Sequence, residues 1–206
     1  LIQAYYEVNP SNNLNPDIFA LKGINALGTA FFVPFQNYLN NSYTQSTSSF
    51  DIVATEDNTI IQITPKKPIQ GHAPNITFSI VLNEGQTWSG RASSTLASQH
   101  PFGTIVTSNK PIAITMSDDS VAGTPYGGCA DIMGDQIVPV SIVGTEYIAV
   151  KGNLNGPDKV FFIPTEPNTT ISLNGNVVST LTTLSSIYTH TLSADAAYYE
   201  LSLIHI

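Results

Sequence analysis

Four of the chain's 15 acidic residues fall in one glycine-rich stretch: Asp118, Asp119, Asp131 and Asp135. Carboxylate oxygens are the ligands that Ca²⁺ prefers in proteins, so these four aspartates are a candidate calcium site. Their spacing matches no EF-hand loop. The alternative is that they cap turns by accepting hydrogen bonds from backbone N–H groups. Both interpretations predict that residues 117–136 form a loop.

Other chemistry has little support in the sequence. The Gly-x-Ser-x-Gly motif of a nucleophilic serine is absent. His72, His100 and His190 lack the spacing of paired metal ligands, so we expect them on the surface or in turns. Cys129 is the only cysteine, which excludes a disulfide within this sequence. It either pairs with a cysteine elsewhere or serves as a small buried residue.

An internal repeat indicates the elements that position these residues. Residues 52–63 return as 162–173, and residues 28–32 return upstream as 144–148, in the same order. In each copy an apolar run enters a Thr-Glu-x-Asn-Thr turn and leaves as alternating apolar and polar residues, a pattern typical of two strands joined tightly. We therefore expect superimposable hairpins over 50–64 and 160–174, with Ile61 and Ile63 buried like Ile171 and Leu173.

Further strands follow the first hairpin. Alternation over 76–82 predicts a strand, whose counterpart in the second copy is expected at 187–192. Residues 103–107 and 112–116 flank Ser108-Asn109-Lys110-Pro111, and a proline at the second position of a turn fixes its own φ. This arrangement predicts another hairpin.

Composition limits the class of protein. Charged residues make up only 11% of the chain, which disfavours long helices, and aromatics reach 9%. The net charge of −8, with 7 Lys and Arg residues, removes the electrostatic attraction on which nucleic-acid binding depends. No apolar run is long enough to span a bilayer. We expect an extracellular all-β protein that binds no nucleic acid and has no membrane span in this sequence.

The repeat predicts the domain organisation: an N-terminal extension over 1–27, a first β unit over 28–140, and a truncated second unit over 141–200. Residues 201–206 match the translation of a transposase adaptor end used in preparing sequencing libraries. Our hypothesis is that native sequence stops near Glu200 and that these last residues are frayed. The alternative is an ordinary apolar final strand. We also expect further domains of the same chain beyond both ends.

Several motifs occur in one order along the chain. They are Gly28-Thr29-x-Phe31, Phe50-x-Ile52-Val53-Ala54-Thr55-x-Asp57-Asn58-Thr59, Asn83-x-Gly85-Gln86-Thr87, Ser108-Asn109-Lys110-Pro111-Ile112-Ala113 and Asp135-Gln136-Ile137-Val138-Pro139. Together they resemble the IgG Fc-binding protein N-terminal domain family over nearly the whole chain. The residues around Asp118-Asp119-Ser120-Val121 and Gly127-Gly128-Cys129-x-Asp131 are similar to copies in large surface proteins of gliding bacteria, which typically carry a signal for type IX secretion.

This resemblance implies a secreted or surface-anchored β module without an established catalytic role. It does not by itself carry Fc binding, because a family does not fix a function and no residue set for that activity maps onto this sequence.

We predict two homologous antiparallel β units, sandwich-like, with a propeller-like or barrel repeat as the alternative. The expected function is non-enzymatic recognition or adhesion by a module of a larger surface protein, with a protein or glycan ligand. A structural spacer is the second hypothesis. The third is a carbohydrate-active enzyme that uses two loop carboxylates. Aromatic residues such as Trp88, Tyr198 and Tyr199 either stack on sugars or fill the interior.

Overall fold

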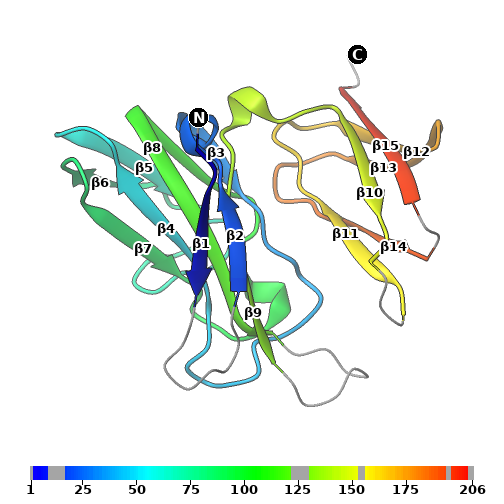
Figure 1. The fold of residues 1–206 in the computed structure, drawn as a ribbon, viewed down its shortest axis with the longest axis horizontal. Coiled ribbons are helices and arrows are strands. Elements are labelled where there is room, and N and C mark those ends of the chain that lie inside the picture. Colours follow the sequence, from blue (N-terminus) through cyan, green and yellow to red (C-terminus); the bar gives the residue numbers. More distant parts are fainter. Residues whose placement is uncertain (1, 9–16, 122–129, 153–155, 194–195, 204–206) are drawn as a thin grey trace. The chain divides into compact units, whose positions relative to one another are not determined.

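The computed structural model describes residues 2–8, 17–121, 130–152, 156–193 and 196–203 (Figure 1). The chain divides into two compact units, Leu1–Ile142 and Val143–Ile206. The strand pairs in both are antiparallel, which confirms the prediction of an all-β protein built from two antiparallel units. The helices of the described residues are short 3-10 turns: η1 (Gly23–Ala26), η2 (Ala97–Gln99) and η3 (Val140–Ile142). None of them has the length and apolar character that a membrane span requires.

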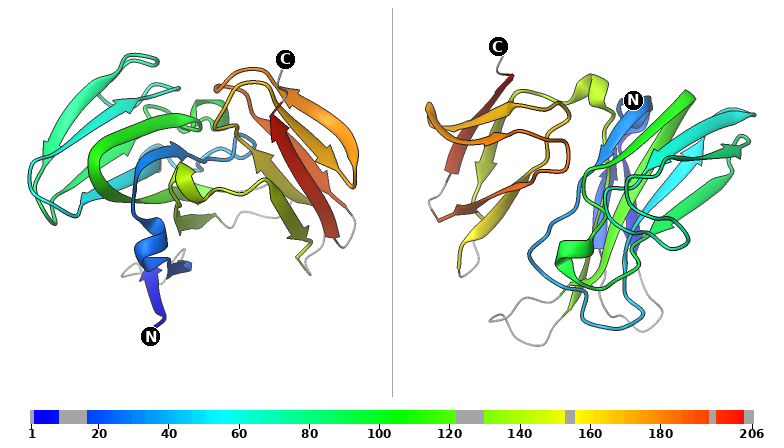
Figure 2. Two further views of the ribbon diagram at one scale, coloured as in Figure 1. Left: turned by 90° about the horizontal axis from the view of Figure 1, so that it is seen from above. Right: turned by 180° about the vertical axis from the view of Figure 1, so that it is seen from behind.

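The first unit is built around one sheet of seven strands. These are β3 (Gly28–Val33), β4 (Ser48–Ala54), β5 (Thr59–Thr64), β6 (Phe78–Leu82), β7 (Thr87–Arg91), β8 (Thr104–Val121) and β9 (Asp131–Gln136). A strand has two edges, yet β8 pairs with four strands, β3, β4, β5 and β9. It therefore belongs to two layers in succession, and Figure 2 shows its strong curvature.

The change of layer occurs at Pro111. Residues 105–108 of β8 pair with β5, and residues 112–118 pair with β4. Proline has no N–H to donate to a neighbouring strand, so Pro111 fits between the segment of β8 that pairs with β5 and the segment that pairs with β4. The hairpin predicted around Ser108-Asn109-Lys110-Pro111 is wrong, because this segment is a bend within one strand. The loop predicted over 117–136 is wrong at both ends, since residues 117–121 continue β8 and β9 (Asp131–Gln136) pairs back with it, while residues 122–129 lie outside the described residues.

The side chains that alternate toward the interior come from both layers. In the layer of the first half of β8, Phe31 of β3, Ile61 and Ile63 of β5 and Val106 of β8 itself are all fully buried. Their counterparts in the other layer, which are also fully buried, are Phe50, Ile52, Ile112 and Ile114. Period-two alternation of this kind makes one hydrophobic core between two layers.

The connection between β4 and β5 is not a hairpin, contrary to the prediction. The two strands pair with different halves of β8, so residues 55–58 carry the chain from one layer to the other. The alternation pattern predicts the strands correctly but contains no information about their partners.

Residues 1–27, predicted as an extension, include a hairpin that packs onto the first unit. Strands β1 (Ala4–Val8) and β2 (Asp17–Leu21) pair with each other. Asp17 Oδ2 accepts a hydrogen bond from the N–H of Gly134 on β9 at 2.7 Å. At the other end of β2, the Lys22 N–H donates to Gln136 Oε1 at 2.6 Å, and the Lys22 ammonium pairs with Asp135. Two attachments thus fix the hairpin along β9.

The second unit repeats the strand order of the first. Its strands are β10 (Glu146–Val150), β11 (Asp158–Phe162), β12 (Thr169–Leu173), β13 (Asn176–Leu181), β14 (Tyr188–Leu192) and β15 (Ala196–Leu203). They form one sheet in the order β10-β15-β12-β13 and a second sheet of β11 and β14. The first unit contains the same two arrangements. The order β3-β8-β5-β6 corresponds to β10-β15-β12-β13, and the pair of β4 with β7 corresponds to the pair of β11 with β14.

The register agrees in both units, except that the pairing of β12 with β13 shifts after Ile171. Thr59 lies opposite Leu82 and Thr169 opposite Leu181, while Ile52 lies opposite Trp88 and Phe162 opposite Tyr188. The expected place of residues 187–192 is therefore wrong: β14 corresponds to β7, and β13 takes the place of β6. The predicted faces agree, since Ile171 is fully buried and Leu173 packs against the same core cluster.

Residues 201–203 are not frayed. They lie in β15 and pair with Thr169, Thr170 and Ile171 of β12, and Leu201 lies opposite Ile171 as Ser108 lies opposite Ile61 in the first unit. The adaptor origin of residues 201–206 stays a prediction. Residues 204–206 and Cys129 lie outside the described residues.

Candidate functional site

Asp118 lies at the buried end of β8 and is 1% exposed. Its Oδ1 accepts hydrogen bonds from Asn41 Nδ2 and Ser48 Oγ, both at 2.8 Å. Its Oδ2 accepts one from Gln36 Nε2 at 2.9 Å. A buried carboxylate is tolerated when donors of this kind replace its hydration. The network ties the connection between β3 and β4 to the start of β4 and to β8.

His100 completes this network and is fully buried, so it is not the surface histidine that was one of the two expectations, although it does lie in a turn, at the end of η2. Asn41 donates through its Nδ2, which leaves its Oδ1 as the acceptor for His100 Nε2–H at 3.1 Å. His100 Nδ1 lies 3.4 Å from Asp118 Oδ2. Burial lowers the pKa of His100 below its ordinary 6.5, against the opposing effects of Asp118 and the Gln36 carbonyl.

The other three predicted calcium ligands lie near this network in sequence but have partners of their own. Asp119 Oδ1 accepts from Ser120 Oγ at 2.8 Å, and Asp131 Oδ1 accepts from the N–H of Ile132 at 2.9 Å. Asp135 is paired with Lys22. Within the described residues, no group of three or more His, Cys, Asp or Glu side chains is arranged to hold a metal ion. Calcium binding stays a prediction.

Three of the sequence motifs meet at one corner of the first unit. Asn109 Oδ1, in the bend of β8, accepts from the N–H of Ile60 at 2.8 Å, and Lys110 Nζ donates to the Asp57 carbonyl at 2.6 Å. From the turn after β6, Asn83 Oδ1 accepts from the N–H of Asn58 at 3.0 Å. These side chains satisfy the backbone of the layer-crossing connection, where ladder partners end. We assign these motifs to the fold.

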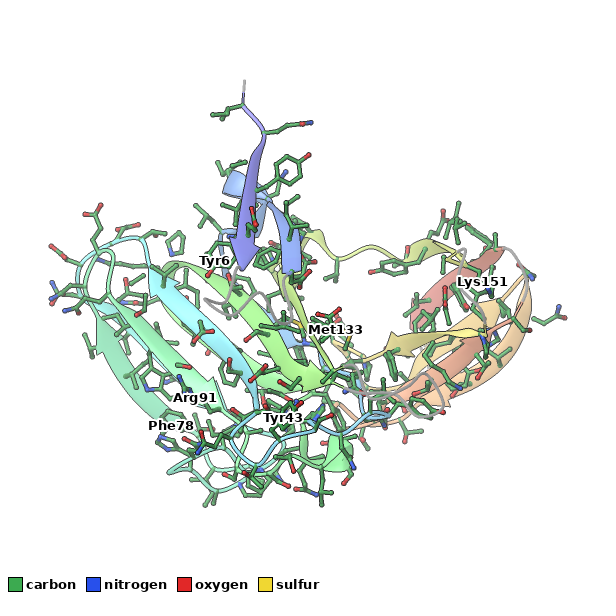
Figure 3. The ribbon with its side chains drawn as sticks, turned by 60° about the horizontal axis from the view of Figure 1, so that its bottom comes forward. Tyr6, Tyr43, Phe78, Arg91, Met133 and Lys151 are labelled. Atoms are coloured by element: carbon green, nitrogen blue, oxygen red, sulfur yellow. The ribbon has the colours of Figure 1, made fainter. Side chains whose placement is uncertain are left out.

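A groove lies elsewhere on the first unit, between the β1–β2 hairpin and the outer face of the sheet. Its volume is about 190 Å³. Tyr6 and Phe19 come from the hairpin, with ring centroids 5.1 Å apart. Asp51 on β4 and Thr115 on β8 lie opposite each other in the pairing and line the sheet side. Figure 3 shows Tyr6 projecting from β1.

Gly134 on β9 allows the β1–β2 hairpin to pack closely against the sheet. A Cβ at this position would lie 3.3 Å from the ring of Phe19 and 3.1 Å from the Met116 carbonyl, so the absence of a side chain lets the hairpin lie close to β9. Phe19 is buried there, whereas Tyr6 remains 49% exposed. Phe19 therefore packs against the sheet, and the Tyr6 ring beside it remains accessible to a ligand.

The polar groups of the groove differ in their availability. Asp17 is occupied, because its two oxygens accept from the N–H groups of Ile18 and Gly134. Within the described residues, the exposed carboxylate of Asp51 and the hydroxyl of Thr115 have no hydrogen-bond or ionic partner. Ser117 Oγ lies 3.0 Å from Ser49 Oγ. A free acceptor and a free hydroxyl therefore lie beside a half-exposed aromatic ring.

Sequence reasoning missed this groove. Asp51 and Thr115 occupy ordinary outward positions of strands, and Tyr6 lies in a hairpin that was interpreted as an extension. The aromatics singled out from the sequence belong elsewhere: Tyr199 is fully buried, and Trp88 packs against Phe50 at 5.9 Å. The only available signal was the alternation that puts Asp51 on the solvent face of β4.

The chain is thus an all-β protein of two antiparallel units, and the first unit carries a small surface groove. The family model for IgGFc binding protein matches residues 18–202, and the chain belongs to this family. The match covers both units but begins after β1, so Tyr6 lies outside it. Searches of curated proteins and of solved structures found no match.

Proposed function

We propose that the chain is a non-enzymatic extracellular recognition module that holds a saccharide in the groove of its first unit. The observation that carries the proposal is the free Asp51 carboxylate and Thr115 hydroxyl beside the half-exposed ring of Tyr6. Saccharides present hydroxyl groups to such polar atoms and C–H faces to aromatic rings. A volume of about 190 Å³ lies below the roughly 300 Å³ of pockets that enclose larger ligands, and it suits a single sugar ring at a chain end.

An enzymatic role receives less support. Glycoside hydrolysis normally uses two carboxyl groups, one on each side of the bond that is cleaved. Of the two carboxylates among the described residues that line the groove, Asp51 is free and Asp17 is held by two backbone N–H groups. A spacer role would need no groove with unpartnered polar groups. A protein ligand is the remaining alternative, and it would be expected to extend beyond so small a depression.

Family membership supports a location outside the cell or on its surface. We propose that the two units are part of a larger protein with further domains. Secretion through a type IX system and a role in gliding stay predictions that rest on the sequence resemblance around 118–131. The family's printed name refers to IgG Fc, and we do not extend that ligand to this chain.

A glycan array tests the proposal. Fluorescently labelled chain should bind at least one group of neutral saccharides, and Tyr6→Ala should remove most of the signal because it removes the stacking surface. Tyr5→Ala is the matched control: Tyr5 is the neighbouring residue on β1, is 62% exposed, and points to the opposite face of the strand.

Two outcomes would contradict the proposal. One is an array without signal, and the other is equal binding by the Tyr6→Ala and Tyr5→Ala variants. Binding to immobilised proteins in place of glycans would support the protein alternative.

A further inference from the structure

The charged side chains that line the groove of the first unit are both acidic. Among the described residues around it, Asp17 and Asp51 carry carboxylates, and none is a lysine, an arginine or a histidine. The two N–H groups that bind Asp17 fix its position but leave its negative charge in place. A cleft lined by charges of one sign concentrates ligands of the opposite sign. The groove therefore favours a cationic group.

Basic side chains of the neighbouring elements do not neutralise these carboxylates. The Lys22 ammonium lies beyond the end of β2 and is paired with Asp135. Arg91, on β7, is exposed and is not among the residues that line the groove. Within the described part of the chain it forms no ion pair with Asp51. The net charge of −8 adds to the negative potential at the groove.

The aromatic wall of the groove has the same preference. Tyr6 is half-exposed, and its ring packs beside that of Phe19 at a centroid distance of 5.1 Å. The face of an aromatic ring is electronegative and attracts a cation that lies within about 6 Å of the ring centre. A neutral sugar gains only C–H contacts on the same surface. The ring of Tyr6 and the carboxylate of Asp51 thus both favour a positively charged sugar.

We propose that the groove prefers a saccharide whose terminal ring carries a free, protonated amino group. This inference rests on the saccharide function proposed above and narrows its ligand. The ammonium group donates to the Asp51 carboxylate and to the Thr115 hydroxyl, which lie opposite each other in the pairing of β4 with β8. Acetylation of the amine removes the charge and adds bulk in a groove of about 190 Å³. Sugars that carry a carboxylate or a sulfate are repelled.

The test compares methyl glycosides that differ only at the second carbon of the ring, which carries an amino, a hydroxyl or an acetamido group, in the gluco, galacto and manno series. Each is titrated into the isotope-labelled full chain, at a pH where the sugar amine is protonated and the chain is folded. Amide chemical shifts give the Kd and the place of binding. We expect the largest shifts at Asp51, Thr115 and Gly134.

In at least one series the amino glycoside should bind about fivefold more tightly than the hydroxyl glycoside, through one exposed ion pair and one cation–π contact. Added salt should reduce this preference, because it screens the attraction between exposed charges. The acetamido glycoside should bind no more tightly than the hydroxyl glycoside.

Two variants separate the charge of the groove from the charge of the whole chain. Asp51→Asn keeps a side-chain acceptor but removes the charge, so the preference for the amine should fall below about twofold while the hydroxyl glycoside binds as before. Glu84→Gln is the matched control, because Glu84 is exposed after β6, does not line the groove, and changes the net charge equally. It should retain the fivefold preference.

Equal affinities for the amino and hydroxyl glycosides would overturn the inference and leave the saccharide function in place. The same holds for a preference that survives in Asp51→Asn or is lost in Glu84→Gln. If no glycoside binds, or if the shifts lie away from the groove, the saccharide function itself is contradicted and the inference falls with it.

Discussion

Thr59 and Thr169 make the same hydrogen bond in the two units. Each Oγ1 donates at 2.7 Å to the carbonyl of the glutamate three residues earlier, Glu56 or Glu166. The asparagine before each threonine has a left-handed backbone, with φ of 53° at Asn58 and 59° at Asn168. This conformation suits asparagine better than most other side chains. The repeated Thr-Glu-x-Asn-Thr pattern therefore specifies one turn geometry in two different sequence settings.

The first prediction concerns this hydroxyl. Thr59→Val keeps the shape of the side chain but leaves the Glu56 carbonyl without its donor, so the free energy of unfolding should fall by about 1–2 kcal/mol. Thr59→Ser retains the hydroxyl and should cost less. Urea denaturation monitored by Trp88 fluorescence measures both variants. Equal losses would mean that the hydrogen bond has no role in stability.

Sequence patterns were sufficient for the repeat and for most strands within it, but they missed β1, β2 and β9 and did not indicate the strand partners. Alternation at Ile61 and Ile63 identifies a buried face, yet the same pattern fits a hairpin and a crossing between layers. Pro111 is equally compatible with a turn and with a bend between two sets of ladder partners. Which one forms depends on contacts distant in sequence, such as that of Asn109 with Ile60.

The candidate site was less predictable for a related reason. An aspartate is rarely fully buried, so Asp118 in a glycine-rich stretch indicated a loop. Its donors, Gln36, Asn41 and Ser48, lie 70 to 82 residues away in sequence. The groove depends on the packing of a hairpin over β9, which no local pattern of residues specifies.

Asp118 should contribute far more to stability than its neighbour. Asp118→Asn places an amide donor among groups that already donate, and we expect a loss of about 3 kcal/mol in the free energy of unfolding. Asp119→Asn is the matched control, with a change within about 0.5 kcal/mol expected, because its carboxylate lies on the partly exposed face of β8. Thermal and urea denaturation compare the two. A small loss for Asp118→Asn would contradict the role of the buried network.

Stability should decrease as the pH falls below about 6.5. Burial lowers the pKa of His100, so the unfolded chain binds this proton more readily than the folded one. Between the unfolded pKa and the lowered folded pKa, acidification therefore favours unfolding, and above that window the contribution is fully present. Urea midpoints measured from pH 7.5 to 5 for the native chain and for His100→Gln test this prediction. Identical pH profiles would show that His100 is not responsible.

Gly90 should not tolerate a side chain. A Cβ there would lie 2.4 Å from the ring of Phe50, which is fully buried. Gly90→Ala should destabilise the chain by about 1–3 kcal/mol through overpacking. Phe50→Leu removes the clashing atoms, so the double variant should lose less than the sum of the two single losses. Additive losses in urea denaturation would argue against this contact.

The most direct test of the account is the affinity of the groove for the saccharide that gives the strongest array signal, measured by titration calorimetry on the full chain. Tyr6→Ala and Asp51→Ala should each raise the Kd about tenfold or more, equivalent to about 1.4 kcal/mol, while Tyr5→Ala should leave it unchanged. If both groove variants bind as tightly as the native chain, the saccharide lies elsewhere and the proposed recognition site is wrong.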